Sequence, residues 1–596
     1  MSSHGGNEKQ NSALEQVPDG GPDLSLKDVE KSGDDSGHGK TAGAVPDNEY
    51  PTGLRLVLIL ASVFSAVFLV SLDRLIVTTA IPAITNEFNS LPDVGWYGSA
   101  YLLTSCAFQL LFGKLYSFYP IRVLYAGSVF LFEVGSALCG AAPNSVALIV
   151  GRAIQGVGSA GMLGGGSVVI IYAVPLAKRP LVQGLLGAIF GVSSILGPLV
   201  GGAFTSNVTW RWCFYINLPL GGVALVTILL LVRIPDRKET KLPTMAKLSQ
   251  LDAAGTTALI PAIVSLLLAL QWGGLTYAWN DRRIIALLTL SGVLGIAFIL
   301  VQAFMPATAT VPPRVFKQRS ILAAFWMTIV IGAQQTLILY FLPIWLQAIM
   351  GVSPVNSGIR LLPTTLSVVV ASLINGIFVT RIGYYAPSAL LGTAISSIGS
   401  GLLMTLEVDT STARFIGYQI LYGFGLGLCN QTPSLVAQTV LPKKDVPIGL
   451  SLVFFSQYFG GAIFLPIGQA LLNNQLLSRL AGIPGFSPSE VQTDGATDLV
   501  NSFAAEYHQD VLLAYNESLR TVFRVGLILA TLSVLGAASL EWRSVKKEKE
   551  EPGNTASSDA ETGNVQSGSA PSAAESLPET EKTATLQSSD AIGKSP

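Results

Sequence analysis

Three charged residues lie inside long apolar runs of the sequence, where charges are rare: Asp73, Glu133 and Arg152. An arginine near the middle of a membrane helix costs about 2.5–3.5 kcal/mol on insertion scales, so it is tolerated where a partner or a water-filled cavity receives it. Two carboxylates facing one guanidinium would leave one acid without a full partner, and such an acid can bind and release a proton. These residues therefore indicate proton transfer within a membrane, and a static neutralising cluster is the alternative interpretation.

Depth along the predicted helices puts the three charges at one level. The first apolar run ends near Ala80, so Asp73 lies roughly 10 Å from that end at 1.5 Å per residue. The same arithmetic places Arg152 at roughly 9 Å and Glu133 at roughly 12 Å from the same membrane surface. We therefore expect all three to meet. Gln419 corresponds to Arg152 in the second half of the chain, which assigns the charge cluster to the first half.

Other chemistry is poorly supported. The three histidines (His4, His38 and His508) lie in a terminal tail or a connecting loop, and no catalytic or metal-binding motif accompanies them. The four cysteines lack CxxC spacing and suit small buried positions. GHGKT at residues 37–41 lacks the first glycine of a P-loop, since Asp34 stands there. We expect no enzyme activity, no metal site and no cofactor.

Composition sets the class of protein. Half of the 596 residues are hydrophobic, only 12% are charged and the mean hydropathy is +0.52, whereas soluble domains carry about 25% charged residues. This indicates an all-α polytopic membrane protein with the lipid bilayer as its partner. A net charge of −1 gives no support for nucleic-acid binding.

Apolar runs of about 20 residues follow one another, and each is long enough to cross about 30 Å of hydrocarbon. They predict fourteen transmembrane helices. Their ranges are 54–80, 95–113, 123–141, 146–173, 182–204, 212–232, 253–271, 284–305, 321–345, 359–379, 387–406, 415–440, 447–472 and 520–540.

Lysine and arginine collect in alternate loops, which predicts that both termini are cytoplasmic. Residues 1–50 and 546–596 are polar and low in aromatic residues, so we expect disordered cytoplasmic tails. With this orientation the sequons at Asn207 and Asn516 lie outside, the second in an outside loop of residues 473–519, and both are candidate glycosylation sites.

The chain also repeats itself. GKLYSFYPIR, residues 113–122, follows the second helix, and GIFVTRIGYY, residues 376–385, follows the tenth. GRAIQGVGSAG in the fourth helix aligns with YQILYGFGLGL in the twelfth. Both matches are displaced by eight helices. We therefore predict two parallel six-helix halves, residues 51–235 and 306–545, with helices 7 and 8 inserted at 236–305 and a substrate cavity between the halves.

Five motifs in order resemble the major facilitator superfamily, in its fourteen-helix drug:proton antiporter group, which includes fungal toxin and multidrug efflux pumps. They are LDRLIVTTAIPAI (72–84), VGWYGSAYLLT (94–104), LIVGRAIQGVGSA (148–160), GVSSILGPLVGG (191–202) and WRWCFYINLP (210–219). The chain departs from the family pattern at Ser117 and Pro120, where the family usually has an Asp and a Gly, and at Leu75, where it usually has Thr. The first departure argues against an ionic contact that closes the cytoplasmic side of the transporter.

The resemblance implies roles for further residues. Those of the conformational motifs are Gly113, Arg122, Gly156, Gly197, Pro198, Gly201 and Gly202. The polar candidates for the substrate cavity are Gln155, Gln334, Gln335, Asn430 and Gln431. Helix packing alone would also explain the glycines, and interhelical hydrogen bonds would explain the amides.

The resemblance implies proton-coupled efflux of hydrophobic or amphipathic small molecules, such as secondary metabolites, toxins or drugs, at the plasma membrane. The alternative is transport of another solute, a siderophore or an amino acid, at the plasma membrane or at a vacuolar or vesicle membrane. A receptor or structural role is a distant third. Since no ATP-binding motif is present, we expect an ion gradient to supply the energy.

Overall fold

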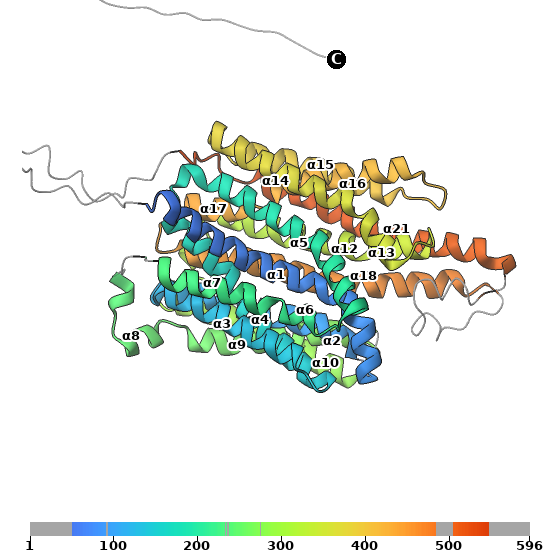
Figure 1. Ribbon diagram of the computed structural model, residues 1–596, viewed down its shortest axis with the longest axis horizontal. Helices are drawn as coiled ribbons and strands as arrows, with labels where there is room; N and C mark the ends of the chain where they lie inside the picture. The colour runs from blue at the N-terminus through green and yellow to red at the C-terminus, as the bar shows by residue number, and fades with distance from the viewer. Residues whose placement is uncertain are drawn as a thin grey trace, which may run out of the picture. The chain divides into compact units, whose positions relative to one another are not determined.

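The structure is a computed structural model that describes residues 50–546, apart from 91–92, 233, 235–237, 275, 484–502 and 504. Both predicted tails, except for Tyr50 and Lys546, and the middle of the predicted outside loop lie outside the described residues. Within the described part, long helices lie side by side in one bundle (Figure 1), and the β-structure there consists of two isolated bridges. The all-α membrane architecture is confirmed.

Twelve helical segments in the described part of the chain are long and apolar enough to cross a membrane. They are α1 (Gly53–Phe88), α3 (Ile121–Gly140), α4 (Ser145–Ala173), α5 (Arg179–Asn207) with the preceding turn η2 (Leu176–Lys178), α6 (Trp212–Tyr215) with α7 (Asn217–Leu231), α9 (Ala253–Trp272), α10 (Arg282–Phe304), α12 (Arg319–Ala348), α14 (Leu362–Ile382), α15 (Ala386–Met404), α18 (Val446–Leu480) and α21 (His508–Ala538).

Two further helices complete the bundle. α2 (Val94–Phe118) packs against α4 and α18, and α16 (Thr412–Cys429), followed by α17 (Thr432–Val440), packs against α14 and α15. The short connecting helices are η3 (Lys238–Lys241), α8 (Thr244–Ser249), α11 (Pro313–Phe316), α13 (Pro354–Arg360) and η4 (Ala505–Tyr507). The predicted count of fourteen crossings is coherent with these positions and stays a prediction.

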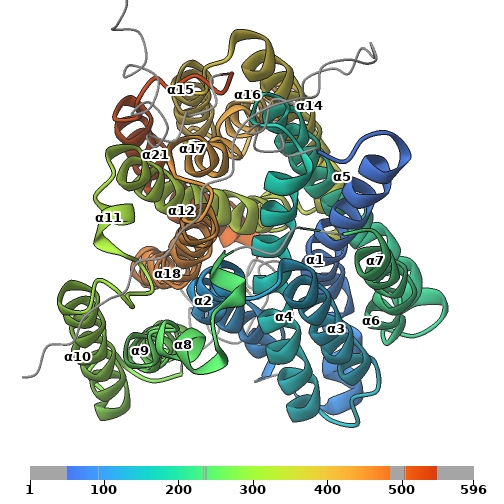
Figure 2. The same cartoon turned by 90° about the vertical axis from the view of Figure 1, so that its left-hand side faces the viewer.

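The two predicted halves meet along two seams that are related by the internal repeat. α2 packs against α18 in one seam and α14 packs against α5 in the other (Figure 2). A Cβ added to Gly113 of α2 would lie 3.3 Å from the Pro447 carbonyl of α18, and one added to Gly376 of α14 would lie 2.8 Å from the Pro180 carbonyl of α5. Corresponding glycines of the repeat therefore make corresponding contacts, which supports parallel halves.

The inserted pair of helices covers one seam only. α9 packs against α2 and α18, while α10 packs mainly against α9 at the rim of the bundle (Figure 2). Asp252 joins the start of α9 to the end of α10 and to the segment that follows α10. Its carboxylate accepts hydrogen bonds from the Gly255 amide, the Gln302 side chain and the amide and hydroxyl of Thr310, at 2.7–2.9 Å. Burial raises the pKa of Asp252, but these hydrogen bonds outweigh burial and hold the pKa below its ordinary value.

We expect Asp252→Ala to lower the unfolding free energy by about 3 kcal/mol, because it removes a helix cap and leaves buried donors unsatisfied. Asp281→Ala is the matched control, since Asp281 caps α10 with one hydrogen bond to the Arg283 amide and its loss should cost about 1 kcal/mol. Thermal unfolding in detergent measures both. The folded-state pKa of Asp252 is lower than its ordinary value of about 4. Its contribution to the free energy of unfolding is therefore present at pH values above about 4 and is lost as the pH falls below that value. Equal losses for the two variants would contradict this role of Asp252.

The outer ends of two helices extend further than predicted. α18 continues to Leu480 and α21 already begins at His508, so Asn516 lies within a helix and is only 3% exposed. Its side chain accepts a hydrogen bond from Trp345 Nε1 at 2.7 Å and donates one to the Leu406 carbonyl at 3.1 Å. The predicted glycosylation of Asn516 is therefore wrong, because a glycan cannot be attached to an amide held inside the bundle.

Asn207 differs, since it is exposed at the end of α5. We expect Asn207→Gln to abolish any shift in electrophoretic mobility produced by glycosidase treatment of the protein from a eukaryotic host. Ser518→Ala, which destroys the other sequon and keeps Asn516, should leave the shift unchanged. A shift that survives Asn207→Gln would contradict this assignment.

Candidate functional site

A buried ion pair joins α1 to α4. Arg152 Nη1 lies 2.5 Å from Asp73 Oδ2, and the two side chains are 2% and 0% exposed. Helix α4 has a small residue at this level: a Cβ on Gly156 would collide with the Tyr101 carbonyl and the Thr104 hydroxyl of α2. The absence of a side chain at Gly156 therefore lets α2 and α4 come close enough to enclose the pair.

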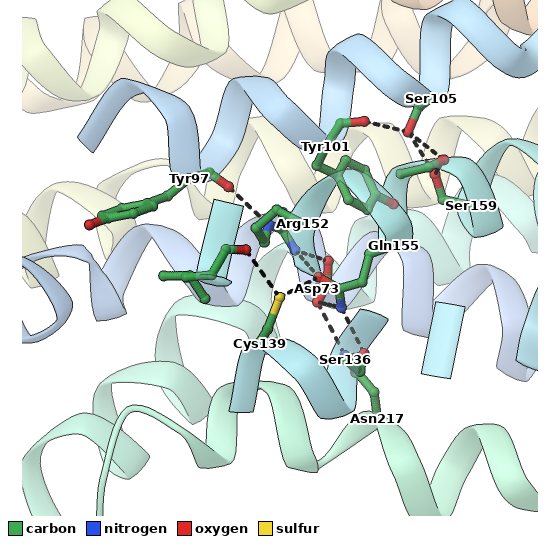
Figure 3. A network of polar contacts seen from close by, with 12 residues as sticks. Asp73, Tyr97, Tyr101, Ser105, Ser136, Cys139, Arg152, Gln155, Ser159 and Asn217 are labelled. Atoms are coloured by element: carbon green, nitrogen blue, oxygen red, sulfur yellow. Dashed lines mark hydrogen bonds and ion pairs between the residues drawn. The ribbon is translucent and has the colours of Figure 1, made fainter. Parts of the chain in front are cut away.

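Amides and a hydroxyl complete the network around Asp73 (Figure 3). Asp73 Oδ1 accepts hydrogen bonds from Gln155 Nε2 at 2.9 Å and from Asn217 Nδ2 at 3.1 Å, and both amides also donate to Ser136 Oγ. The network therefore links α1, α3, α4 and α7. Gln155 was predicted to line the substrate cavity, but it is fully buried and belongs to this network instead.

Arg152 is held on several sides. Its Nε donates to the Tyr97 carbonyl at 2.9 Å, its Nη1 also donates to Gln155 Oε1 at 2.8 Å, and its guanidinium carbon lies 4.6 Å from the centre of the Tyr101 ring. A buried charge that is paired and hydrogen-bonded in this way is tolerated, whereas removal of one partner leaves an uncompensated charge.

Glu133 does not join the ion pair, contrary to the prediction that all three charges would meet. It is 9% exposed, and neither carboxylate oxygen has a hydrogen-bond partner among the described residues. The side chain points instead from α3 towards α7, where a Cβ on Gly221 would collide with it. Equal depth did not bring it to Arg152 because the amides of Gln155 and Asn217 occupy the remaining side of Asp73.

The two carboxylates of this site have different surroundings. Asp73 has a cation and two amide donors that stabilise its ionised form, while Glu133 has neither. An isolated ionised carboxylate in an apolar interior is costly, and the group avoids that cost when it carries a proton. The site therefore places a carboxylate with a full set of partners near one that has no partner among the described residues.

The other cavity candidates lie in the second half. Gln334 on α12 is buried, and neither polar atom of its side chain has a partner, while Gln335 is partly exposed. Asn430 and Gln431, between α16 and α17, are also partly exposed, and Asn430 accepts a hydrogen bond from Gln457 at 3.2 Å. These four amides stay candidates.

The predicted conformational residues of α5 behave differently from one another. Gly197 and Gly201 face α1 of the same half: a Cβ on Gly197 would lie 2.8 Å from Leu75 Cβ, and one on Gly201 would lie 2.8 Å from the Ile76 carbonyl. Gly202 has no atom within 4 Å of that position, so its predicted role in close packing is wrong. Pro198 lies inside the continuous helix α5, where its nitrogen cannot donate a backbone hydrogen bond.

The sequence predicted only some of the residues at the two seams. Gly184 and Gly187 of α5 contact Ser372 of α14 across the two halves, and Gly113 contacts Ser451 of α18 in the other seam. Arg122 is exposed at the start of α3, away from these contacts. The signal for the α5 glycines was their spacing of three residues, which places both on one helix face.

Asn217 and Ser136 were also missed as members of the site. Asn217 was present in the WRWCFYINLP motif at residues 210–219, where an amide at the start of an apolar helix is a signal of a buried hydrogen bond. Ser136 had no signal, because serine is common in membrane helices.

Comparison with known proteins identifies relatives over most of the chain. Residues 63–465 match the Major Facilitator Superfamily. An MFS-type transporter of Claviceps purpurea is 53% identical over 84% of this chain and 87% of its own length. The MFS-type efflux pump MFS1 of Trichophyton rubrum is 47% identical over 84% of this chain and 94% of its own length.

A solved structure shows the same fold. The proton:xylose symporter XylE, a major facilitator superfamily protein, matches with a TM-score of 0.52 at 13% identity, over 80% of this chain and 94% of its own. At this identity the match concerns the fold alone.

Proposed function

Because this chain belongs to the major facilitator superfamily, a family of membrane transporters of small molecules, we propose that it exports hydrophobic or amphipathic small molecules in exchange for protons. The substrates are secondary metabolites, toxins or drugs, and the site of action is the plasma membrane. Relatives named as efflux pumps that align over most of this chain support the direction of transport.

The observation that carries the proton coupling is the buried network around Asp73 and Arg152, with Glu133 beside it. A structural ion pair needs one acid, yet this site buries two. Glu133 lies one turn of α3 from Ser136, which accepts hydrogen bonds from both amides bound to Asp73, so the two carboxylates would repel each other if both were ionised. A proton on Glu133 removes that repulsion, and a proton on Asp73 would weaken its links to α4 and α7. Proton binding can thus change the packing of α1 within the first half.

The proposed transport cycle uses the two seams. In this structure both seams are closed at the end where α2 finishes and α5 begins, since Gly113 contacts Ser451 and Gly184 contacts Ser372. The charge distribution of the loops predicts that this end is cytoplasmic. We infer a state closed to the cytoplasm, and rocking of the halves about the central cavity would open it.

The test uses proteoliposomes that contain the purified protein and a fluorescent amphipathic dye. An imposed pH gradient should drive efflux of the dye, and a protonophore should abolish it. Dye movement that ignores the gradient would refute proton coupling. Deletion of the protein in its own host should also increase the intracellular retention of a secondary metabolite, toxin or drug. If a siderophore or an amino acid is retained instead, the alternative solutes are favoured.

A further inference from the structure

Arg74 follows Asp73 in α1 but faces away from the buried network. Its guanidinium carbon lies 5.2 Å from the centre of the Tyr458 ring on α18, a helix of the other half. Among the described residues, the ion pairs involve Arg152, Arg211, Arg314, Arg520 and Arg543, and none involves Arg74. Arg74 is thus a cation between the two halves that has an aromatic neighbour and no carboxylate partner.

Exposure along two facing helices shows where Arg74 sits. On one face of α1, Ser71 is buried, Arg74 is partly exposed and Thr78 is exposed. Along α18, Phe455 is buried, whereas Tyr458 is partly exposed. Both helices therefore become more accessible in the same direction. The contact between Arg74 and Tyr458 therefore lies at the interface of the halves, where the side chains of both helices begin to be exposed.

The side chains around this contact suit a flat, conjugated molecule. Phe455 and Phe459 of α18 stack on each other on either side of Tyr458 in sequence, with ring centres 5.2 Å apart. Tyr101 of α2 is buried, and its ring contacts the guanidinium of Arg152. Aromatic rings stack on a planar ligand, and a guanidinium binds oxyanions with directed hydrogen bonds.

We propose that Arg74 binds the negative charge of a planar aromatic substrate, a phenolate or a carboxylate, beside Tyr458 at the interface of the two halves. This proposal rests on the proposed export function and narrows its substrate class. It also gives a role to an arginine that has no carboxylate partner among the described residues, since an unpaired charge inside the bundle is costly until a ligand supplies the counter-charge. Arg74 directly follows Asp73 in α1, so the substrate would bind next to the proton-binding network.

The test compares two xanthene dyes of opposite charge, fluorescein and rhodamine 123, in proteoliposomes under a pH gradient. Wild-type protein should export fluorescein. Arg74→Gln should lower fluorescein export by about tenfold or more, as expected for loss of a charge-assisted contact, and leave rhodamine 123 export unchanged or higher. Arg74→Lys should retain part of the fluorescein export. Arg283→Gln, which removes an exposed charge at the start of α10, is the matched control and should change neither dye.

Each other outcome has a defined meaning. Equal losses of both dyes in Arg74→Gln would show a structural role and overturn the proposal, as would unchanged fluorescein export. If wild-type protein exports rhodamine 123 but not fluorescein, the substrate class is wrong while the proposed export function stands. If it exports neither dye under the gradient, the proposed function fails with it.

Discussion

Asp73→Asn is expected to reduce gradient-driven efflux at least a hundredfold. The substitution preserves the shape of the side chain but leaves Arg152, which is 2% exposed, without its counter-charge. Breaking a buried ion pair by removing one partner costs about 3–5 kcal/mol, and 1.4 kcal/mol corresponds to a factor of ten. The same change removes one of the two acids that the coupling mechanism requires. The measurement is dye efflux from proteoliposomes under an imposed pH gradient.

A loss of folding would mimic this result, so a second variant is needed. Asp73→Asn combined with Arg152→Gln removes both charges and should restore thermal stability without restoring gradient-driven efflux. Glu133→Gln should keep the fold and flatten the dependence of efflux on pH, because its carboxylate makes no hydrogen bond that the amide would break. Efflux at the wild-type rate in both Asp73→Asn and Glu133→Gln would remove both carboxylates from the proton path.

The sequence allowed the central pair to be predicted because the argument depended on depth alone. Helix rise is constant, so the positions of Asp73 and Arg152 along their helices place them at one level, and the structure pairs them. The direction of a side chain around its helix is a separate quantity, since each residue turns by about 100°. Depth therefore did not reveal that Glu133 faces Gly221 and that two amides surround Asp73.

Helix ends and packing partners show the same limit. The apolar pattern of the last helix begins near residue 520, because polar residues precede it, yet α21 begins at His508 and buries Asn516. Tertiary hydrogen bonds from Trp345 and to Leu406 make that polar turn part of the bundle. Similarly, neighbouring glycines look alike in the sequence, but a Cβ on Gly201 would collide with α1, whereas no described atom lies within 4 Å of a Cβ on Gly202. Only the positions of the neighbouring helices distinguish them.

These positions lead to the second large expected effect. Gly184→Leu should reduce transport about a hundredfold, because a Cβ at this position would already lie 2.6 Å from the Ser372 carbonyl across the seam between α5 and α14. Overpacking of a well-packed contact costs about 1–3 kcal/mol for small additions, and here the obstacle is backbone that cannot rotate away. Each half would still fold, so the variant should reach the membrane but should not close at this end.

Two other glycines of α5 provide the controls. Gly202→Leu adds the same side chain where no atom lies within 4 Å and should transport normally. Gly197→Leu collides with Leu75 inside one half, so its expected defect is lower thermal stability rather than a failure of closure.

Closure itself can be measured in the opposite seam. Ser451 is 2% exposed and faces Gly113 between α2 and α18, so a cysteine introduced there should be protected from an impermeant maleimide supplied on the predicted cytoplasmic side. If the halves move as rigid bodies, Gly184→Leu must open this seam too, and labelling at position 451 should rise. Normal transport by well-expressed Gly184→Leu, or unchanged labelling at position 451, would show that the two seams do not close together and would contradict the rocking mechanism.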